Sequence, residues 1–456
     1  MTTNAPRFAL LALLGEGFFS RLSFGLISFA LPLYARGLGM SLTEIGLLIS
    51  LNAAVTILCK PVMGSLADRY GWRRSLLTGV GLRSVSTLLF AVSWMPWHLF
   101  GIRALLGLSQ SLRSPAINAL LAECGGKKSA ASVFAWYSTA KTVAASAGRA
   151  VAGILLALTA GTFAPVFVVA FVLSAVPLLV VWLYVRDPEG RVRKSPIATN
   201  EQSPANEPAT ETRPGMLPIV GLGALMSGTA QMLHGLFPIL ATEYAGLGTA
   251  ETGLIYLAST LVTMAAGPIF GWLSDHVSRE LVLLVRGAAN ILSSAVYLFA
   301  PGLAGVTVAR LTDDLGKAAF RPAWGAMMSS ASSHDTQNRA RRMGVMSLGE
   351  DAGDLVGPAL AGFLWSTGGI GALMGVRIVL AALTEVYAIV VTHKLNAAEN
   401  ACAQESKQLN PVAQTTAHDI RRRHSKTDPA PAAPGASTRD IDTIHARPVI
   451  SGTTRD

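Results

Sequence analysis

The chain has 456 residues, of which 51% are hydrophobic and only 14% are charged. Because soluble domains carry about 25% charged residues, this composition argues against an ordinary soluble enzyme or binding domain. The net charge of +10 lies mainly in short loops and in a tail, which is typical of a membrane protein and argues against a nucleic-acid partner.

Apolar blocks follow one another along the chain, each about as long as a helix that crosses a bilayer, which is ~20 residues. They begin near residues 8, 42, 75, 97, 130, 162, 216, 251, 280, 303, 343 and 370. Chain in lipid must satisfy its backbone hydrogen bonds within its own segment, which favours helices. The sequence therefore predicts an all-α membrane protein with twelve transmembrane helices.

Two segments interrupt this pattern. Residues 187–215 are rich in Pro, Ser, Thr, Glu and Asn and are interpreted as a flexible cytoplasmic linker. Residues 395–456 lose the apolar character and are predicted to form a disordered cytoplasmic tail. The remaining chain is predicted to form an N-terminal bundle of six helices over residues 1–186 and a C-terminal bundle of six helices over residues 216–394.

Positive charges alternate from one predicted connection to the next. The connections on one side hold most of the cations, among them Arg69, Arg73, Arg74, Lys127 and Lys128. The opposite connections hold essentially only Arg36. Since loops rich in Lys and Arg stay in the cytoplasm, we expect an integral protein of a bacterial inner membrane with both termini in the cytoplasm.

The two halves repeat each other at a constant spacing of 207 residues. Gly64-Ser65-Leu66-Ala67-Asp68-Arg69 matches Gly271-Trp272-Leu273-Ser274-Asp275-His276, Arg103 matches Arg310, and Pro115-Ala116 matches Pro322-Ala323. Matches in one register across both halves indicate duplication of a unit of six helices. Such duplication predicts a substrate path between the halves, near the middle of the membrane.

The segment Gly64-x-Leu66-x-Asp68-Arg69-x-Gly71-x-Arg73-Arg74 resembles the motif between the second and third helices of the major facilitator superfamily. The resemblance covers roughly residues 8–393 and implies two pseudo-symmetric bundles of six helices. It also implies that this segment forms a conformational latch, made by Gly64, Asp68, Arg69, Gly71, Arg73, Arg74 and, in the second copy, Asp275.

One position departs from the pattern of exporters in that family. Gly357-Pro358-x-x-x-Gly362 resembles their glycine and proline motif, but the first half has Gly148-Arg149-x-x-x-Gly153 at the position where that motif belongs. Arg149 stands where proline is expected. This departure weakens the prediction of an efflux antiporter.

Ionisable and polar residues inside the apolar blocks are the candidates for substrate binding, because they are costly in lipid. At 100° per residue, those in the block near residue 303 fall within an arc of about 100°, and those in the blocks near 97 and 216 form similar stripes. The candidates are Arg21, Gln110, Arg113, Gln231, His234, Asp313, Asp314 and Lys317. Alternatively, Asp313 with Lys317 and Arg310 with Asp314 are structural pairs four residues apart.

Carboxylates within the predicted helices are the candidates for proton coupling. Glu350, Asp351 and Asp354 are so close in sequence that they should repel one another, which favours a proton on at least one of them. Glu16 and Arg103 complete this set. The alternative is that the three neighbouring carboxylates pair with cations such as Arg69, Arg73 or Arg342 at the cytoplasmic end.

The sequence lacks the Gly-x-x-x-x-Gly-Lys-Ser/Thr loop of ATP-driven pumps. Its three cysteines are scattered without metal-ligand spacing, and no nucleophile–base arrangement stands out. We therefore predict no metal site, no cofactor and no enzyme activity. We expect a monomeric secondary transporter of a small organic solute, working by alternating access and driven by protons, in one form as an efflux antiporter. The first alternative is a carrier of an anionic or zwitterionic metabolite, bound by Arg21, Arg113, Lys141 and Arg149. A membrane sensor without transport is the remote alternative.

Overall fold

Helices make up nearly all of the chain that the structure describes. The computed structural model describes residues 5–185, 216–276, 279–332 and 339–409, and this part contains no strand. The predicted linker and most of the predicted tail lie outside these ranges. In chain order the elements are α1 Ala5–Gly37, α2 Leu42–Tyr70, α3 Trp72–Ala91, α4 Pro96–Leu158, α5 Ala164–Tyr184, α6 Leu217–His234, α7 Phe237–Ile239, the π-helix η1 Leu240–Tyr244, α8 Thr249–His276, α9 Arg279–Phe299, α10 Leu303–Ser332 and α11 Arg339–Leu409.

Helix α4 reverses direction within its 63 residues. A guanidinium nitrogen of Arg113 lies 3.1 Å from the hydroxyl of Tyr137, 24 residues away. In a straight helix these residues would be separated by about 36 Å. Helix α4 therefore supplies two transmembrane segments, called here its first arm (residues 96–121) and its second arm (residues 133–158).

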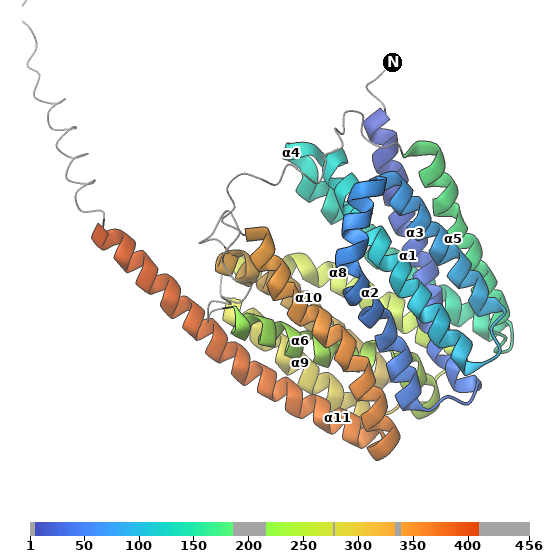
Figure 1. Ribbon diagram of the computed structural model, residues 1–456. Coiled ribbons are helices and arrows are strands. Elements are labelled where there is room, and N and C mark those ends of the chain that lie inside the picture. Colours follow the sequence, from blue (N-terminus) through green and yellow to red (C-terminus); the bar gives the residue numbers. More distant parts are fainter. Residues whose placement is uncertain (1–4, 186–215, 277–278, 333–338, 410–456) are drawn as a thin grey trace, which may run out of the picture. The chain divides into compact units, whose positions relative to one another are not determined.

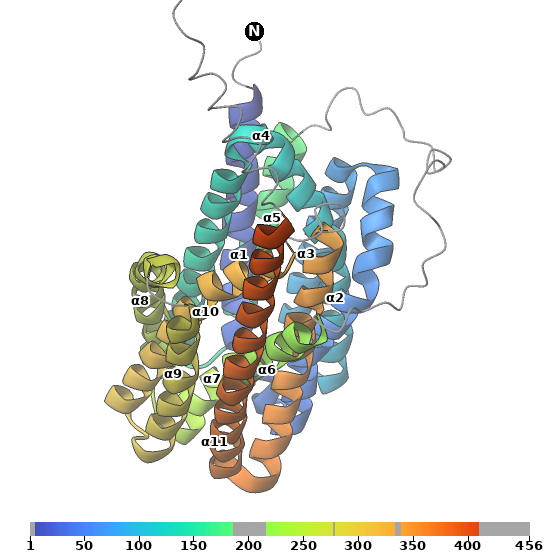
Figure 2. The same ribbon diagram turned by 90° about the vertical axis from the view of Figure 1, so that its left-hand side faces the viewer.

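Helix α11 also contains two transmembrane segments. Its helical geometry breaks at Gly369, whose φ of 70° is readily adopted only by glycine. Figures 1 and 2 both show the two arms of α11 side by side, joined by a tight turn. If α6, α7 and η1 are counted as one irregular segment, the described chain has twelve transmembrane segments. This number confirms the twelve transmembrane helices predicted from the sequence.

Six helical segments meet a strict criterion of length and hydropathy for crossing a membrane. One of them, Gly344–His393, covers both arms of α11. Other segments fall below the criterion because polar or charged residues interrupt their apolar runs. Helix α10 is the clearest case, since Arg310, Asp313, Asp314 and Lys317 all lie in its middle.

Hydrophobic packing differs between the two ends of the bundle. At one end a single core joins both halves, with Leu26 and Phe29 of α1 in the same cluster as Phe237 and Tyr256. At the other end each half has its own core, one around Tyr137 and one around Trp324 and Met346. Among the described residues, the halves therefore meet through a continuous apolar core at one end, and each half has a separate core at the other.

Two glycine crossings close this shared end. Gly46 of α2 packs on Pro358 and Gly362 of α11, and Gly253 of α8 packs on Gly153 of α4. A Cβ atom at Gly46 would overlap the carbonyl oxygen of Pro358. Gly46 and Gly253 are separated by the repeat spacing of 207 residues, so the same crossing occurs in each half.

We expect Gly46→Leu to open the shared end, because the larger side chain separates α2 from α11. In a cysteine-free background, a cysteine at the buried position Ser50 should then react faster with a membrane-impermeant thiol reagent. Gly101→Leu is the matched control, since a Cβ at Gly101 meets no atom within 4 Å. Equal labelling rates in both variants would contradict the proposed role of this crossing.

The end of α11 differs from the sequence prediction. Residues 395–409, expected to belong to a disordered tail, continue the helix to Leu409. This stretch holds four alanines with Glu399 and Glu405, all strong helix formers. Asn396–Asp456 forms a structural unit separate from Met1–Leu395, and its residues 410–456 lie outside the described chain.

Candidate functional site

A cavity of about 520 Å³ lies between the two bundles. Along the second arm of α4 its lining begins after Tyr137, in the core of the first half, and ends before Ala152, in the shared core. The cavity thus lies just inside the closed end. Its volume is within the range of ~300–1,000 Å³ that is usual for small-molecule sites.

One wall of the cavity comes from the first half. The second arm of α4 contributes residues at steps of three and one, which places them on a single helical face. Helix α1 adds Arg21. The wall consists of Arg21, Ser138, Lys141, Thr142, Ala145, Ser146 and Arg149.

The other wall comes from the second half, and charged residues of α10 dominate it. These residues are spaced by four, three and four positions, so they too share one face. Helix α6 adds His234, and α8 adds two threonines. The wall consists of His234, Thr260, Thr263, Arg310, Asp314, Lys317 and Arg321. Of the predicted substrate-binding residues, the structure therefore places Arg21, His234, Asp314 and Lys317 on the cavity.

Three cations of the first wall are held by neutral groups. The guanidinium of Arg21 lies 5.1 Å from the ring centre of Phe24, and the Lys141 ammonium lies 4.8 Å from that of Tyr137. Arg149 lies 4.8 Å from the ring centre of Tyr256. Among the described residues, none of these three cations has a carboxylate within ion-pair distance.

Arg149 also connects the two halves. Its Nη2 lies 3.2 Å from Nε2 of His234, and its Nε donates to the hydroxyl of Ser28 at 3.2 Å. Because arginine can only donate, Nε2 of His234 must accept the hydrogen bond. The imidazole is therefore neutral, with its proton on Nδ1, and Arg149 keeps an uncompensated charge.

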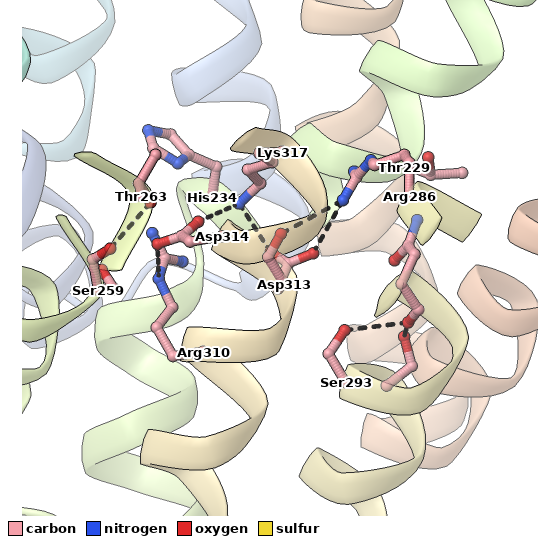
Figure 3. Close-up of polar contacts among 12 residues, drawn as sticks. Thr229, His234, Ser259, Thr263, Arg286, Ser293, Arg310, Asp313, Asp314 and Lys317 are labelled. Atoms are coloured by element: carbon pink, nitrogen blue, oxygen red, sulfur yellow. Dashed lines mark hydrogen bonds and ion pairs between the residues drawn. The ribbon is translucent and has the colours of Figure 1, made fainter. Parts of the chain in front are cut away.

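Two of the three cations that α10 contributes to the cavity, Arg310 and Lys317, are in contrast paired with carboxylates (Figure 3). Arg310 is 3.0 Å from Asp314. Lys317 lies between two carboxylates, 2.7 Å from Asp313 and 2.8 Å from Asp314. These are the pairs that the sequence offered as the structural alternative, and Lys317 and Asp314 also face the cavity.

Asp313 is fully buried and lies outside the cavity lining. Besides Lys317 it is contacted by Arg377 of α11 at 2.7 Å and by Arg286 of α9 at 3.4 Å. Arg377 also donates to the hydroxyl of Ser294. Neither arginine was among the predicted site residues, although a single charge in an apolar segment is the signal that could have identified them.

A second buried charge cluster lies in the first half. Nε of Arg113 is 2.5 Å from Glu16, and Nη2 of Arg113 donates both to the same carboxylate at 3.0 Å and to Tyr137. Ser20 donates to Glu16 at 2.9 Å. Glu16 is fully buried. Arg113, predicted to bind substrate, is thus held by Glu16 and does not line the cavity.

Arg83 of α3 lies close to this cluster and was not among the predicted residues. Its guanidinium is 5.7 Å from the ring centre of Phe24, which Arg21 also contacts. Its Nε and Nη2 are buried and have no hydrogen-bond partner in the described structure. Together with Arg21 it makes the interior of the first half strongly basic.

Three other predicted residues lie apart from the cavity. Arg103 donates to the backbone carbonyls of Leu48 and Ile49 in α2, at 3.3 and 3.4 Å. Gln110 is half-buried in α4. Gln231 donates to Asp354 at 2.9 Å. None of them belongs to the lining residues.

The neighbouring carboxylates of α11 lie in three different environments. Glu350 accepts a hydrogen bond from Nε1 of Trp324. Asp354 accepts one from Ser227 at 2.5 Å in addition to that from Gln231. Asp351 lies 4.0 Å from Lys60 of α2, across the interface between the halves.

The predicted latch surrounds the junction of α2 and α3. Gly71 separates the two helices with a φ of 98°, and Nη2 of Arg73 donates to the carbonyl of Trp182 at 2.7 Å. Arg69 and Arg74 are exposed, and Gly64 has open space around it. The side chains of Asp68 and Asp275 lie outside the described part of the chain.

Within the described ranges, no group of three or more His, Cys, Asp or Glu residues could hold a metal ion. The cavity instead presents six cations, one carboxylate and several hydroxyl groups. Such a lining suits the binding of an acidic small molecule.

Comparisons with known proteins agree with this architecture. The model of the Major Facilitator Superfamily matches residues 16–312 and 219–430. The chain is 25% identical over 364 residues to the "Multi-drug resistance efflux pump PmrA homolog" of Lactococcus lactis subsp. lactis, which covers 76% of this chain and 86% of that protein. It is 31% identical over 121 residues to the "Quinolone resistance protein NorA" of Staphylococcus aureus, covering 26% of this chain and 30% of that protein.

Solved structures share the fold at low sequence identity. A bacterial homologue of the human lysosomal transporter Spinster, in an inward-facing and occupied conformation, matches with a TM-score of 0.68 and 16% identity over 86% of this chain and 98% of that chain. The nucleoside transporter NupG matches with a TM-score of 0.65 and 14% identity, over 84% of this chain and 98% of that chain.

Proposed function

Because the chain belongs to the Major Facilitator Superfamily and is an integral membrane transporter, we propose that it carries an anionic or zwitterionic organic solute by alternating access. The observation that carries this proposal is that the three cations on the first wall of the cavity, Arg21, Lys141 and Arg149, have no carboxylate partner among the described residues. A charge in a low-dielectric site is costly unless it is paired. An acidic solute supplies the missing partner.

The closed and open ends support the alternating-access part of the proposal. The halves share a core at the end with Gly46 and Gly253 and have separate cores at the other end. If the basic loops are cytoplasmic, the closed end faces outward and the cavity belongs to an inward-facing state. The latch around Asp68 would then have to form when the opposite end closes.

The orientation and the location of the chain in the membrane are supported by its loops and its relatives. The basic connections support a chain with both termini in the cytoplasm. Bacterial relatives support an inner-membrane location. We propose that one copy of the chain is the transport unit, since the cavity is lined by both of its own halves.

The printed names of two relatives favour a second candidate, which is an efflux pump for chemically diverse compounds. Export and an anionic solute are compatible, so this candidate differs mainly in the charge of the preferred compound. The cations of the cavity argue against a lipophilic cation, because it would meet like charges in a low-dielectric site.

The purified protein in lipid nanodiscs tests the proposal directly. Binding of benzoate, a simple carboxylate, should be detected by calorimetry, and tetraphenylphosphonium should not compete with it. A variant that combines Arg21→Gln, Lys141→Gln and Arg149→Gln should weaken benzoate binding, whereas Lys60→Gln, which removes a cation outside the cavity, should leave it unchanged. Binding of tetraphenylphosphonium without binding of benzoate would overturn the proposal and favour the second candidate.

We also propose that Glu16 couples transport to protons. The carboxylate is buried and holds Arg113, so a proton on Glu16 would release this guanidinium next to the cavity wall. Arg113 contacts the hydroxyl of Tyr137, and the Lys141 ammonium packs over the ring of the same tyrosine. A change at Glu16 therefore reaches a cavity cation through two contacts.

Glu16→Gln is expected to lower proton-driven accumulation by about ten-fold or more while solute exchange without a gradient persists. The amide mimics the protonated carboxyl group. The variant should fold, because Arg113 is the one cation of the described chain that is paired with Glu16. Accumulation and counterflow in proteoliposomes measure the two activities. Asp354→Asn tests the competing carboxylate, which is half-buried and held by Ser227 and Gln231. Loss of both activities in Glu16→Gln would contradict the coupling role.

A further inference from the structure

We propose that the preferred solute is an organic dianion whose two acidic groups are well separated, as in a dicarboxylate. One group is held by Lys141 with Arg21, and the other by Arg149. This inference rests on the proposed function and deepens it, because it specifies the number and spacing of the solute's charges.

The two positions lie at different levels of the cavity wall. Lys141 and Arg149 are eight residues apart on one face of α4, which corresponds to about 12 Å along the helix axis. The Lys141 ammonium lies over Tyr137, four residues back along the helix. Arg149 is directed toward Ser28, His234 and Tyr256 on three other helices.

Arg21 belongs to the position of Lys141. Tyr137 contacts Glu16 and Arg149 contacts Ser28, and each pair is separated by 121 residues. The second arm of α4 therefore runs parallel to α1 in a constant register. In this register Arg21 lies at the level of Thr142, next to Lys141.

Nearby carboxylates are already engaged at both positions. Glu16, which contacts Tyr137 next to Lys141, is bound by Arg113. Asp314, across the cavity from Arg149, is bound by Arg310 and Lys317. Each position thus keeps a positive charge that no acid of the described chain neutralises, and a solute with two separated acidic groups could pair with both.

The geometry of Arg149 prepares it for a carboxylate. Its Nε and Nη2 are engaged by Ser28 and His234, which restrain the guanidinium plane. The contact with the Tyr256 ring supports the same plane. A restrained guanidinium binds an acid with a smaller loss of side-chain entropy than a free one.

Binding to the full-length protein in nanodiscs tests this inference with three probes of defined charge. Adipate has two separated carboxylates, hexanoate has one on the same chain length, and hexyl phosphate carries its charge in one compact group. The affinity for adipate should be higher than that for hexanoate by about ten-fold or more. Hexyl phosphate should bind like hexanoate.

Two variants assign the positions. Lys141→Gln and Arg149→Gln should each reduce adipate affinity to that of hexanoate, while each changes hexanoate affinity much less, because the monoanion can use the other position. Lys141→Arg should keep the wild-type preference for adipate, and Lys60→Gln controls for the loss of a charge outside the cavity.

The outcomes separate this inference from the proposed function. Equal affinities for adipate and hexanoate in the wild type, or equal weakening of both by Lys141→Gln, would overturn the dianion but leave an anion transporter. Tight binding of hexyl phosphate at the level of adipate would overturn the requirement for separated charges. Failure of all three anions to bind would overturn the proposed function itself.

Discussion

Asp313→Asn should leave little folded protein in the membrane. The carboxylate is fully buried, and Arg377, Lys317 and Arg286 lie 2.7, 2.7 and 3.4 Å from it. Removing one partner of a buried ion pair costs about 3–5 kcal/mol, and here three cations lose their common partner. Membrane abundance and thermal unfolding of the purified variant measure the effect.

Two further variants test the cause of this loss. Asp314→Asn should be milder, because that carboxylate is partly exposed and contacts two cations instead of three. Arg286→Gln in the Asp313→Asn background should restore part of the stability, since it removes one of the cations left without a partner. If Asp313→Asn folds as well as the wild type, the cluster is not what holds α9, α10 and α11 together.

The twelve helices could be predicted because their signal is local. Apolar length and the 207-residue repeat are properties of the printed sequence, and neither depends on which helix packs against which. The reversal of α4 between Arg113 and Tyr137 follows the same rule, since two apolar blocks lie within one continuous helix. Only the helical continuation after residue 395 was missed, because the low hydropathy there masked a run of strong helix formers.

The partners of the buried charges could not be predicted in the same way. Helical periodicity places Arg310, Asp313 and Lys317 on one side of α10, but it says nothing of α9 and α11, whose Arg286 and Arg377 complete the cluster. Arg113 shows the converse case. The sequence offers no partner within its own helix, whereas packing brings Glu16 from α1.

Positions 149 and 358 show what the departure from the family pattern achieves. Gly148 and Gly153 are spaced like Gly357 and Gly362, and Gly153 and Gly362 take part in the two crossings at the closed end. Between the glycines of each pair, the second half has Pro358 and the first half has Arg149. The scaffold of the crossing is retained, and the arginine adds a cation to the cavity.

Arg149→Gln is expected to weaken binding of a dianion such as adipate by about ten-fold or more, the range for a lost hydrogen bond to a charged group. The same variant should be more stable than the wild type in the absence of ligand, by about 0.5–2 kcal/mol. Arg149 is 9% exposed, and its partners within the described chain are all neutral, so the folded protein bears a desolvation cost that glutamine avoids.

This opposition between binding and stability distinguishes a functional cation from a structural one. Asp313→Asn should lower the melting temperature with or without ligand, whereas Arg149→Gln should raise it without ligand and lose the further increase that adipate gives the wild type. Arg149→Lys, which keeps the charge but not the fork of donors, should keep part of that increase. A lower melting temperature for Arg149→Gln without ligand would show that the contacts with Ser28 and His234 hold the halves together, and would assign Arg149 to the interface instead of the solute.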